Sequence, residues 1–171
     1  LTTHGSEAVR QKATQVFGTA NSNRQAVVAK FAETEKLKGD AAKGRVLFQS
    51  LCAACHQFGG MGIPLGADLA ALSDKSTEAL VIAILDPNRA VEDKYQLCTV
   101  TLTDGTTLAG MIQSESETTI TLRGMDGSTQ DLPRNTVDQL VNTGRSAMPE
   151  GLEAALTPQT MSDLVAFLQG G

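Results

Sequence analysis

Apolar residues at the start of the chain recur at helical spacing. They lie three or four residues apart over residues 6–17, as one face of a helix requires, and Val28, Phe31 and Glu35 share one face of a second pattern over residues 24–38. The polar run at residues 21–23 separates the two patterns. Residues 1–38 are therefore predicted to form a helical N-terminal extension of two helices.

Three further helices are indicated by residues that cap helix N-termini. A side-chain oxygen of Asp, Ser or Thr accepts a hydrogen bond from a backbone N–H of the first turn. Such residues precede three apolar patterns: Asp40 before residues 41–51, Ser76 before 77–85 and Thr157 before 158–169. Pro158 supports the last of these, because the first helical position needs no N–H donor.

Between residues 95 and 132 the apolar period changes to two. Apolar and polar residues alternate over residues 98–103, which is typical of a strand with one buried face. Asp-Gly pairs at 104–105 and 126–127 favour tight hairpin turns. The pattern predicts a small antiparallel β-meander of four strands, followed by a short helical turn over residues 135–140.

The segment Cys52-Ala53-Ala54-Cys55-His56 is a motif for covalent attachment of a c-type haem. Two cysteines three apart in a helical turn project from one face, so both thiols can reach the vinyl groups of one porphyrin. His56 follows on the same side and offers iron its proximal nitrogen. One motif predicts one haem, with Cys52 and Cys55 binding the cofactor and His56 binding iron.

Two other uses of such a motif have less support. A zinc site needs four well-placed ligands, but Cys55 and His56 are adjacent and the only other histidine is His4. Cys98, the third cysteine, lies in a predicted strand. This position favours a role as a buried core thiol rather than as a reactive or iron-binding one. A thioredoxin-type pair follows a strand, whereas this motif follows a predicted helix.

The second axial ligand must come from the remaining sulfur and imidazole side chains, which are Met61, Met111, Met125, Met148, Met161, Cys98 and His4. Met161 and Met111 lie in predicted apolar faces and Met125 in a hairpin. Met61 follows His56 by only five residues. Met148 lies in an irregular segment just before Pro149, which disfavours helix. A stiff loop that presents a thioether suits a distal ligand. Met148 is therefore predicted to be the distal ligand, and a packing methionine is the alternative.

Composition and charge narrow the function classes. The 171 residues are 41% hydrophobic, which is enough to form a core. Only 4% are aromatic, so few side chains could stack on nucleic-acid bases. A net charge of −5 argues against nucleic acid or anionic membrane partners. The longest apolar run, residues 79–85, is too short to span a bilayer. The chain begins at Leu1 without a signal-peptide pattern, so a mature form or an excised soluble domain is expected.

The residues around the motif resemble the class I cytochrome c fold. In that fold the first and last helices cross where a glycine lets their backbones approach, and Gly44 with Phe48 ahead of the motif fits this pattern. More specifically, the chain resembles the haem-binding domain of planctomycete and verrucomicrobial type, which commonly ends membrane-bound dehydrogenases. The matching stretches are residues 44–56, 85–89, 101–110 and 146–152.

This resemblance implies a fold class, a domain division and a ligand pair. The expected protein is mostly α, a class I cytochrome c fold over residues 39–171, with the small β-meander (about 95–132) inserted before the distal methionine loop. The implied axial iron ligands are His56 and Met148.

The sequence departs from the family after the motif. Relatives of this type usually carry Gly-Pro-Asp-Leu there, and the proline carbonyl accepts a hydrogen bond from the proximal histidine. The corresponding run here is Gly66-Ala67-Asp68-Leu69. The carbonyl of Ala67 is expected to take over this role for His56, without the fixed φ of proline.

The combined prediction is a one-electron carrier rather than an enzyme, with iron cycling between ferrous and ferric forms. Haem attachment of this kind normally occurs outside the cytoplasm, so a periplasmic location is expected, with a dehydrogenase as donor and a downstream acceptor. Arg89 is a candidate to pair with a haem propionate, a surface arginine being the alternative. The alternative functions are a gas sensor or a peroxidase-like haem, which need an open sixth position, and a structural haem beside a β interaction module.

Overall fold

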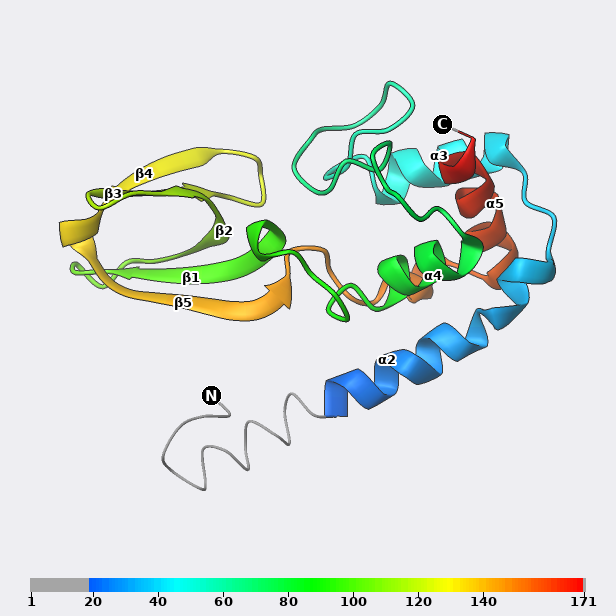
Figure 1. Ribbon diagram of the computed structural model, residues 1–171, viewed down its shortest axis with the longest axis horizontal. Coiled ribbons are helices and arrows are strands. Elements are labelled where there is room, and N and C mark those ends of the chain that lie inside the picture. Colours follow the sequence, from blue (N-terminus) through cyan, green and yellow to red (C-terminus); the bar gives the residue numbers. More distant parts are fainter. Residues whose placement is uncertain (1–18, 171) are drawn as a thin grey trace.

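Figure 1 shows the computed structural model, which describes residues 19–170 as a group of helices beside an antiparallel sheet. The helical elements are α2 (Thr19–Lys30), η2 (Ala32–Lys36), α3 (Ala41–Leu51), α4 (Thr77–Leu85), η5 (Leu152–Ala155) and α5 (Pro158–Gln169). The sheet follows the 3₁₀ turn η3 (Asp93–Tyr95) and lies between α4 and η5 in the sequence. The helix expected over residues 6–17 lies outside the described residues.

The three predicted N-caps are confirmed. Each capping side chain accepts a hydrogen bond from a backbone N–H of its own first turn: Asp40 from Ala42 and Lys43, Ser76 from Ala79, and Thr157 from Thr160. Helices α3, α4 and α5 therefore begin where the sequence indicates.

Helices α3 and α5 cross with their backbones in close approach, as expected at Gly44. A Cβ atom at Gly44 would lie 1.9 Å from the carbonyl oxygen of Asp163, so only glycine fits there. One turn later Phe48 is fully buried, and its ring centroid lies 5.6 Å from that of Phe167 and 6.1 Å from that of Phe58. This crossing fixes the end of α3, from which the CxxCH motif continues.

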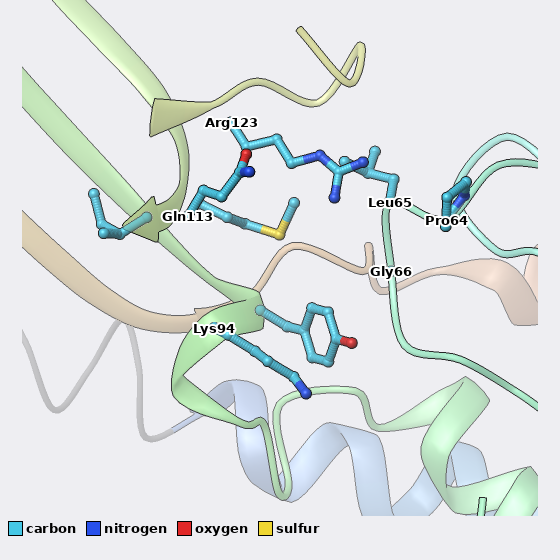
Figure 2. Close-up of a pocket in the computed structure, with 9 residues that line it drawn as sticks. Pro64, Leu65, Gly66, Lys94, Gln113 and Arg123 are labelled. Carbon is cyan, nitrogen blue, oxygen red and sulfur yellow. The ribbon is translucent and has the colours of Figure 1, made fainter. Parts of the chain in front are cut away.

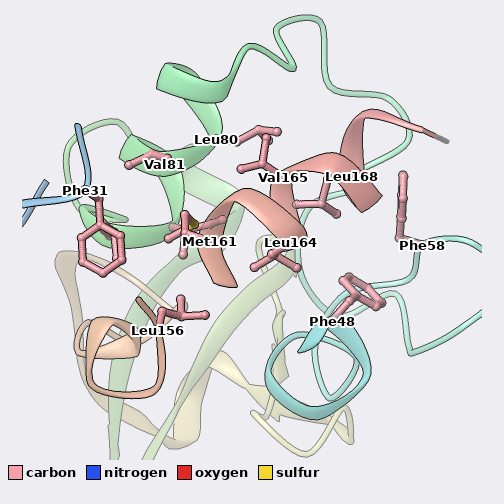
Figure 3. Packing of buried hydrophobic residues seen from close by; sticks show 12 residues of the cluster. Phe31, Phe48, Phe58, Leu80, Val81, Leu156, Met161, Leu164, Val165 and Leu168 are labelled. Atoms are coloured by element: carbon pink, nitrogen blue, oxygen red, sulfur yellow. The ribbon is translucent and has the colours of Figure 1, made fainter. Parts of the chain in front are cut away.

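The helical core gathers buried side chains from both ends of the sequence (Figure 3). Its members are Phe31, Phe48, Phe58, Leu80, Val81, Ile84, Leu85, Leu156, Met161, Leu164, Val165 and Leu168. Phe31 belongs to the N-terminal extension, so that extension is packed into the helical core.

Helix α2 runs without a break through residues 21–23, so the predicted interruption there is wrong. Asparagine costs less than about 1 kcal/mol in a helix interior, and tertiary contacts farther along the helix outweigh that cost. Arg24 is buried and donates from Nε to the carbonyl oxygen of Leu85 at 2.7 Å. Its two terminal nitrogens also pair with the carboxylate of Glu153, at 2.6 and 2.8 Å.

The sheet has five antiparallel strands in the order β4-β3-β2-β1-β5. These strands are β1 (Gln96–Leu102), β2 (Thr107–Glu115), β3 (Thr119–Arg123), β4 (Thr129–Pro133) and β5 (Val137–Ser146). Gly105 and Gly127 adopt positive φ in the two predicted Asp-Gly turns. The sheet encloses its own small core of Val100, Leu122 and Leu132.

Strand β5 replaces the short helical turn predicted over residues 135–140. The structure holds only a 3₁₀ turn, η4 (Arg134–Thr136), before the chain extends and pairs with β1. Most of β5 is exposed at the sheet edge. Because it buries neither face, it lacks the alternation that marks a strand, and its conformation depends on the partner strand.

The expected mostly α, class I cytochrome c fold is wrong. Helices make up 37% of the protein and strands 26%, and the sheet extends beyond residue 132 to Ser146. The β segment is a five-stranded sheet with its own core rather than a small meander. Among the described helices, none is long and apolar enough to cross a membrane.

Candidate functional site

The CxxCH motif continues directly from the end of α3. Cys52 is the C-cap residue, and the N–H groups of Cys55 and His56 donate to its carbonyl oxygen at 3.0 and 2.8 Å. This tight turn holds the two cysteines and the histidine on one short piece of backbone. Both thiols are free and half-buried.

His56 is oriented by a backbone carbonyl, as the sequence predicts. Its Nδ1 lies 2.9 Å from the carbonyl oxygen of Ala67. A carbonyl only accepts, so Nδ1 must carry the hydrogen and Nε2 keeps its lone pair for a metal. The hydrogen bond therefore selects the tautomer that an iron ligand needs.

Gly66 packs directly against the His56 ring. A Cβ atom at Gly66 would lie 2.6 Å from Cε1 of the imidazole, and 3.0 Å from both ring nitrogens. The N–H groups of Leu65 and Gly66 donate to the carbonyl oxygen of Cys55, which ties this loop to the motif. The loop forms a close-fitting cradle on one side of the proximal imidazole.

Burial makes the Cys52 thiol a weak acid. Desolvation, with a smaller contribution from Cys55, raises the pKa of Cys52 to about 11. Reactive redox cysteines have lowered pKa values, so the environment of Cys52 does not resemble a thioredoxin-type site.

Met148 lies half-buried between β5 and η5 and packs against the helical core. Its N–H donates to Oγ of Ser146 at 3.1 Å, and the N–H of Ala147 donates to the carbonyl oxygen of Tyr95 at 2.8 Å. Cys52 packs against the same core. The structure thus brings the Met148 segment and the CxxCH motif to one group of apolar side chains.

The remaining candidates for the second axial position lie in other environments. Met161 is completely buried in α5 and Met111 is 4% exposed in β2, which confirms both as core residues. Met125 is 41% exposed in the turn between β3 and β4. Met61 is half-buried against the helical core, within the loop that follows the motif. His4 lies outside the described residues.

Cys98 is a buried thiol of β1, as the alternation predicts. It is 4% exposed, and desolvation raises its pKa. Arg89, the residue expected near a haem propionate, lies exposed in the turn after α4. Its N–H donates to the carbonyl oxygen of Asp86.

A pocket of about 230 Å³ separates the motif loop from the sheet (Figure 2). Pro64, Leu65 and Gly66 line it on one side. The other side is formed by Lys94, Tyr95, Met111, Ile112, Gln113 and Arg123. Arg123 extends across the pocket toward Leu65 in Figure 2. The sheet therefore lies beside the loop that supports His56.

The site residues fit a covalently bound haem. Two half-buried free thiols stand three residues apart in the chain, and His56 presents a fixed tautomer over a glycine cradle. Within residues 19–170 no group of three or more His, Cys, Asp or Glu side chains is arranged to hold a bare metal ion. A haem needs only one imidazole on its proximal side.

Two features that support the site have no clear signature in the sequence. Gly66 lies in the run that follows the motif, and its lack of a side chain lets the loop contact His56. Arg24 gave no signal, because an arginine in an N-terminal helix is usually on the surface. Its ties to Leu85 and Glu153 appear only in the folded chain.

Comparison with known proteins gives one family. Residues 41–171 match the family model described as Cytochrome c, which covers the motif, the sheet and α5. No match is found among curated proteins.

Proposed function

This chain belongs to the cytochrome c family, and on that premise we propose that it is a monohaem electron carrier with His56 and Met148 as axial ligands. Haem-based electron transfer, a covalent haem c and redox partner proteins follow from the family itself. The number of haems, the ligand pair and the partner class are our proposals.

One observation carries the proposal, the setting of His56. The Ala67 carbonyl orients the imidazole and Gly66 supports its face, while the motif provides two thiols three residues apart. A hydrogen bond donated by Nδ1–H to a carbonyl increases the electron donation of the imidazole and helps to set the reduction potential.

The bound haem supplies an iron that changes by one electron between ferrous and ferric forms. The chain's own residues keep that change reversible. Cys52 and Cys55 would anchor the cofactor, and His56 and Met148 would both hold its iron. The apolar core against which Cys52 and Met148 pack excludes water from the neighbouring region, which favours the less charged ferrous state.

Met148 is the part of the proposal that a substitution tests most sharply. A thioether is a soft ligand that favours ferrous iron. The ferric protein should therefore show a weak far-red sulfur-to-iron charge-transfer band. Met148→Ala should abolish this band, lower the midpoint potential by on the order of 100 mV, a fraction of the range that axial ligands span, and let the iron bind carbon monoxide or cyanide.

Met61→Leu is the matched control, since Met61 is also a half-buried methionine packed on the helical core. It should leave the band, the potential and ligand binding unchanged. The opposite result for the two variants would refute Met148 as the ligand. If neither variant had an effect, a five-coordinate haem that senses gases or reacts with peroxide would become the better account.

The wider setting is proposed on chemical grounds. We propose residues 39–171 as the haem domain and residues 1–38 as an N-terminal extension. Because haem c is normally attached outside the cytoplasm, we propose a periplasmic location, with a dehydrogenase as electron donor. Arg89, exposed after α4, is our candidate partner for a haem propionate.

A further inference from the structure

The side chain of Asn88 spans the segment that holds Met148. Its Oδ1 accepts the N–H of Ser146 at 2.8 Å, and its Nδ2 donates to Oε1 of Glu150 at 2.5 Å. Ser146 and Glu150 stand two residues before and two residues after Met148. One amide thus joins the two ends of a five-residue segment with the methionine at its centre.

The orientation of this amide is determined by its partners. A backbone N–H can only donate and an ionised carboxylate can only accept. The oxygen of Asn88 must therefore face Ser146 and its nitrogen must face Glu150, and no other residue of this length provides one acceptor and one donor in this way. Aspartate would lose the donor, and alanine would lose both bonds.

The backbone around Asn88 is fixed by the buried end of α4. It follows buried Asp86 and Pro87 at the end of α4, whose last residue, Leu85, is fully buried in the helical core. The turn is closed by the N–H of Arg89, which donates to the carbonyl oxygen of Asp86 at 3.0 Å. The amide thus links the Met148 segment to the end of α4.

Other bonds hold the same segment, and the Arg145–Glu150 ion pair also spans it. Tyr95 binds the N–H of Ala147, and Oγ of Ser146 binds the N–H of Met148. Arg145 approaches Glu150 at 3.6 Å, and both side chains are partly exposed, which makes that pair weak. Within residues 19–170, Asn88 alone hydrogen-bonds to both ends of the segment from outside it, from the turn after α4.

We propose that Asn88 is a positioning residue that clamps the Met148 segment and keeps the thioether seated on the haem iron. This inference rests on the proposed role of Met148. A ligand on an irregular segment can leave the iron whenever the segment opens, and a bridge across the segment makes opening rarer. Asn88 acts through Ser146 and Glu150 and does not itself touch the iron in this account.

The test compares Asn88→Ala with Asn142→Ala in the haem-loaded protein. Asn142 is a matched control, because its side chain also accepts a backbone N–H, from Gly144 at 2.8 Å, and donates to a side chain, Gln96, at 2.7 Å. Those bonds lie within the sheet, before the clamped segment. Two readouts are measured: hydrogen exchange at the Ser146 amide, and the rate at which cyanide binds the ferric iron.

Asn88→Ala should speed both processes by roughly tenfold or more, the change expected when one to two hydrogen bonds are lost. The intact mass of this variant should show that the haem is still attached. Glu150→Ala removes one of the two Asn88 bonds and should give a smaller change in the same direction. Asn142→Ala should change neither readout.

The outcomes separate the clamp from the ligand assignment. If Met148→Ala abolishes the far-red band but Asn88→Ala behaves like Asn142→Ala, the clamp is wrong and the ligand stands. If Met148→Ala leaves the band intact, the ligand assignment itself has failed. Should Asn88→Ala not fold, Glu150→Ala provides the same comparison, and an unchanged cyanide rate in that variant would overturn the clamp.

Discussion

At the scale of single residues, the site depends on one atom that is missing and one carbonyl that is present. Gly66 lacks the Cβ that would lie 2.6 Å from the His56 ring, and Ala67 provides the oxygen that accepts from Nδ1. The carbonyl was predictable from the family resemblance, because Ala67 stands where relatives carry the proline whose carbonyl accepts from the histidine. The close packing was not, since it arises from how the loop folds back on Cys55.

Gly66→Ala should therefore displace the imidazole. Adding a methyl group to so tight a contact costs about 1–3 kcal/mol, and here the group that must move is the proposed iron ligand. We expect a shifted Soret band and an altered midpoint potential, measured by absorption spectroscopy and redox titration.

Gly60→Ala is the control for loss of stability alone. Gly60 has a φ of +76° and nothing within 4 Å of an added Cβ. Its substitution should cost about 1–2 kcal/mol through backbone strain and leave the spectrum unchanged. Identical spectra for the two variants would mean that Gly66 does not set the position of His56.

At the scale of elements, capped and amphipathic segments were predictable and the others were not. Helices α3, α4 and α5 follow from their caps, and the first four strands from turn residues and alternation. Strand β5 was not predicted, because an exposed edge strand has no buried face and so no alternation of apolar and polar residues. The N-terminal extension was predicted as helical, but its attachment through Arg24 depends on distant parts of the chain.

Arg24 anchors α2 to the segment that follows Met148. Arg24→Ala should lower the free energy of unfolding by roughly 2–3 kcal/mol, because it leaves the Leu85 carbonyl and the half-buried Glu153 carboxylate without their partner. Lys30→Ala, on an exposed site of the same helix, should change it by less than about 0.5 kcal/mol. Urea unfolding measures both, and equal effects would show that the anchor is unimportant.

The Arg24 effect should also depend on pH. The hydrogen bond from Arg24 lowers the pKa of Glu153 below its ordinary value of 4.5. A group with a lowered folded-state pKa stabilises the fold above its unfolded pKa and loses that contribution as pH falls through the folded value. The gap in stability between wild type and Arg24→Ala should thus be full at pH 6 and shrink below about 4.5. A gap that widened in acid would contradict the pairing.

At the scale of the whole molecule, the sheet is an insertion whose two ends meet. Gln96 and Ser146 are paired across β1 and β5, so the chain leaves the helical unit and returns to it at neighbouring points. Among the residues that the structure describes, the core of the sheet around Val100 shares no member with the helical core. The two units are thus stabilised by separate sets of buried side chains.

Replacing residues 97–145 by a short Gly-Ser hairpin turn should therefore leave the haem unit folded. Paired Cα atoms lie about 5 Å apart, a gap that a two-residue turn closes. The shortened protein should retain covalent haem and the far-red band. Loss of haem would show that the sheet, which lies beside the motif loop across the pocket, is needed to form the site.

If Cys52 and Cys55 hold one haem, intact mass under denaturing conditions will show it. Protein produced in a host that matures c-type cytochromes should exceed its polypeptide mass by a single haem, and Cys52→Ala/Cys55→Ala should lose this addition entirely. An unmodified polypeptide mass, or a second haem, would contradict the account.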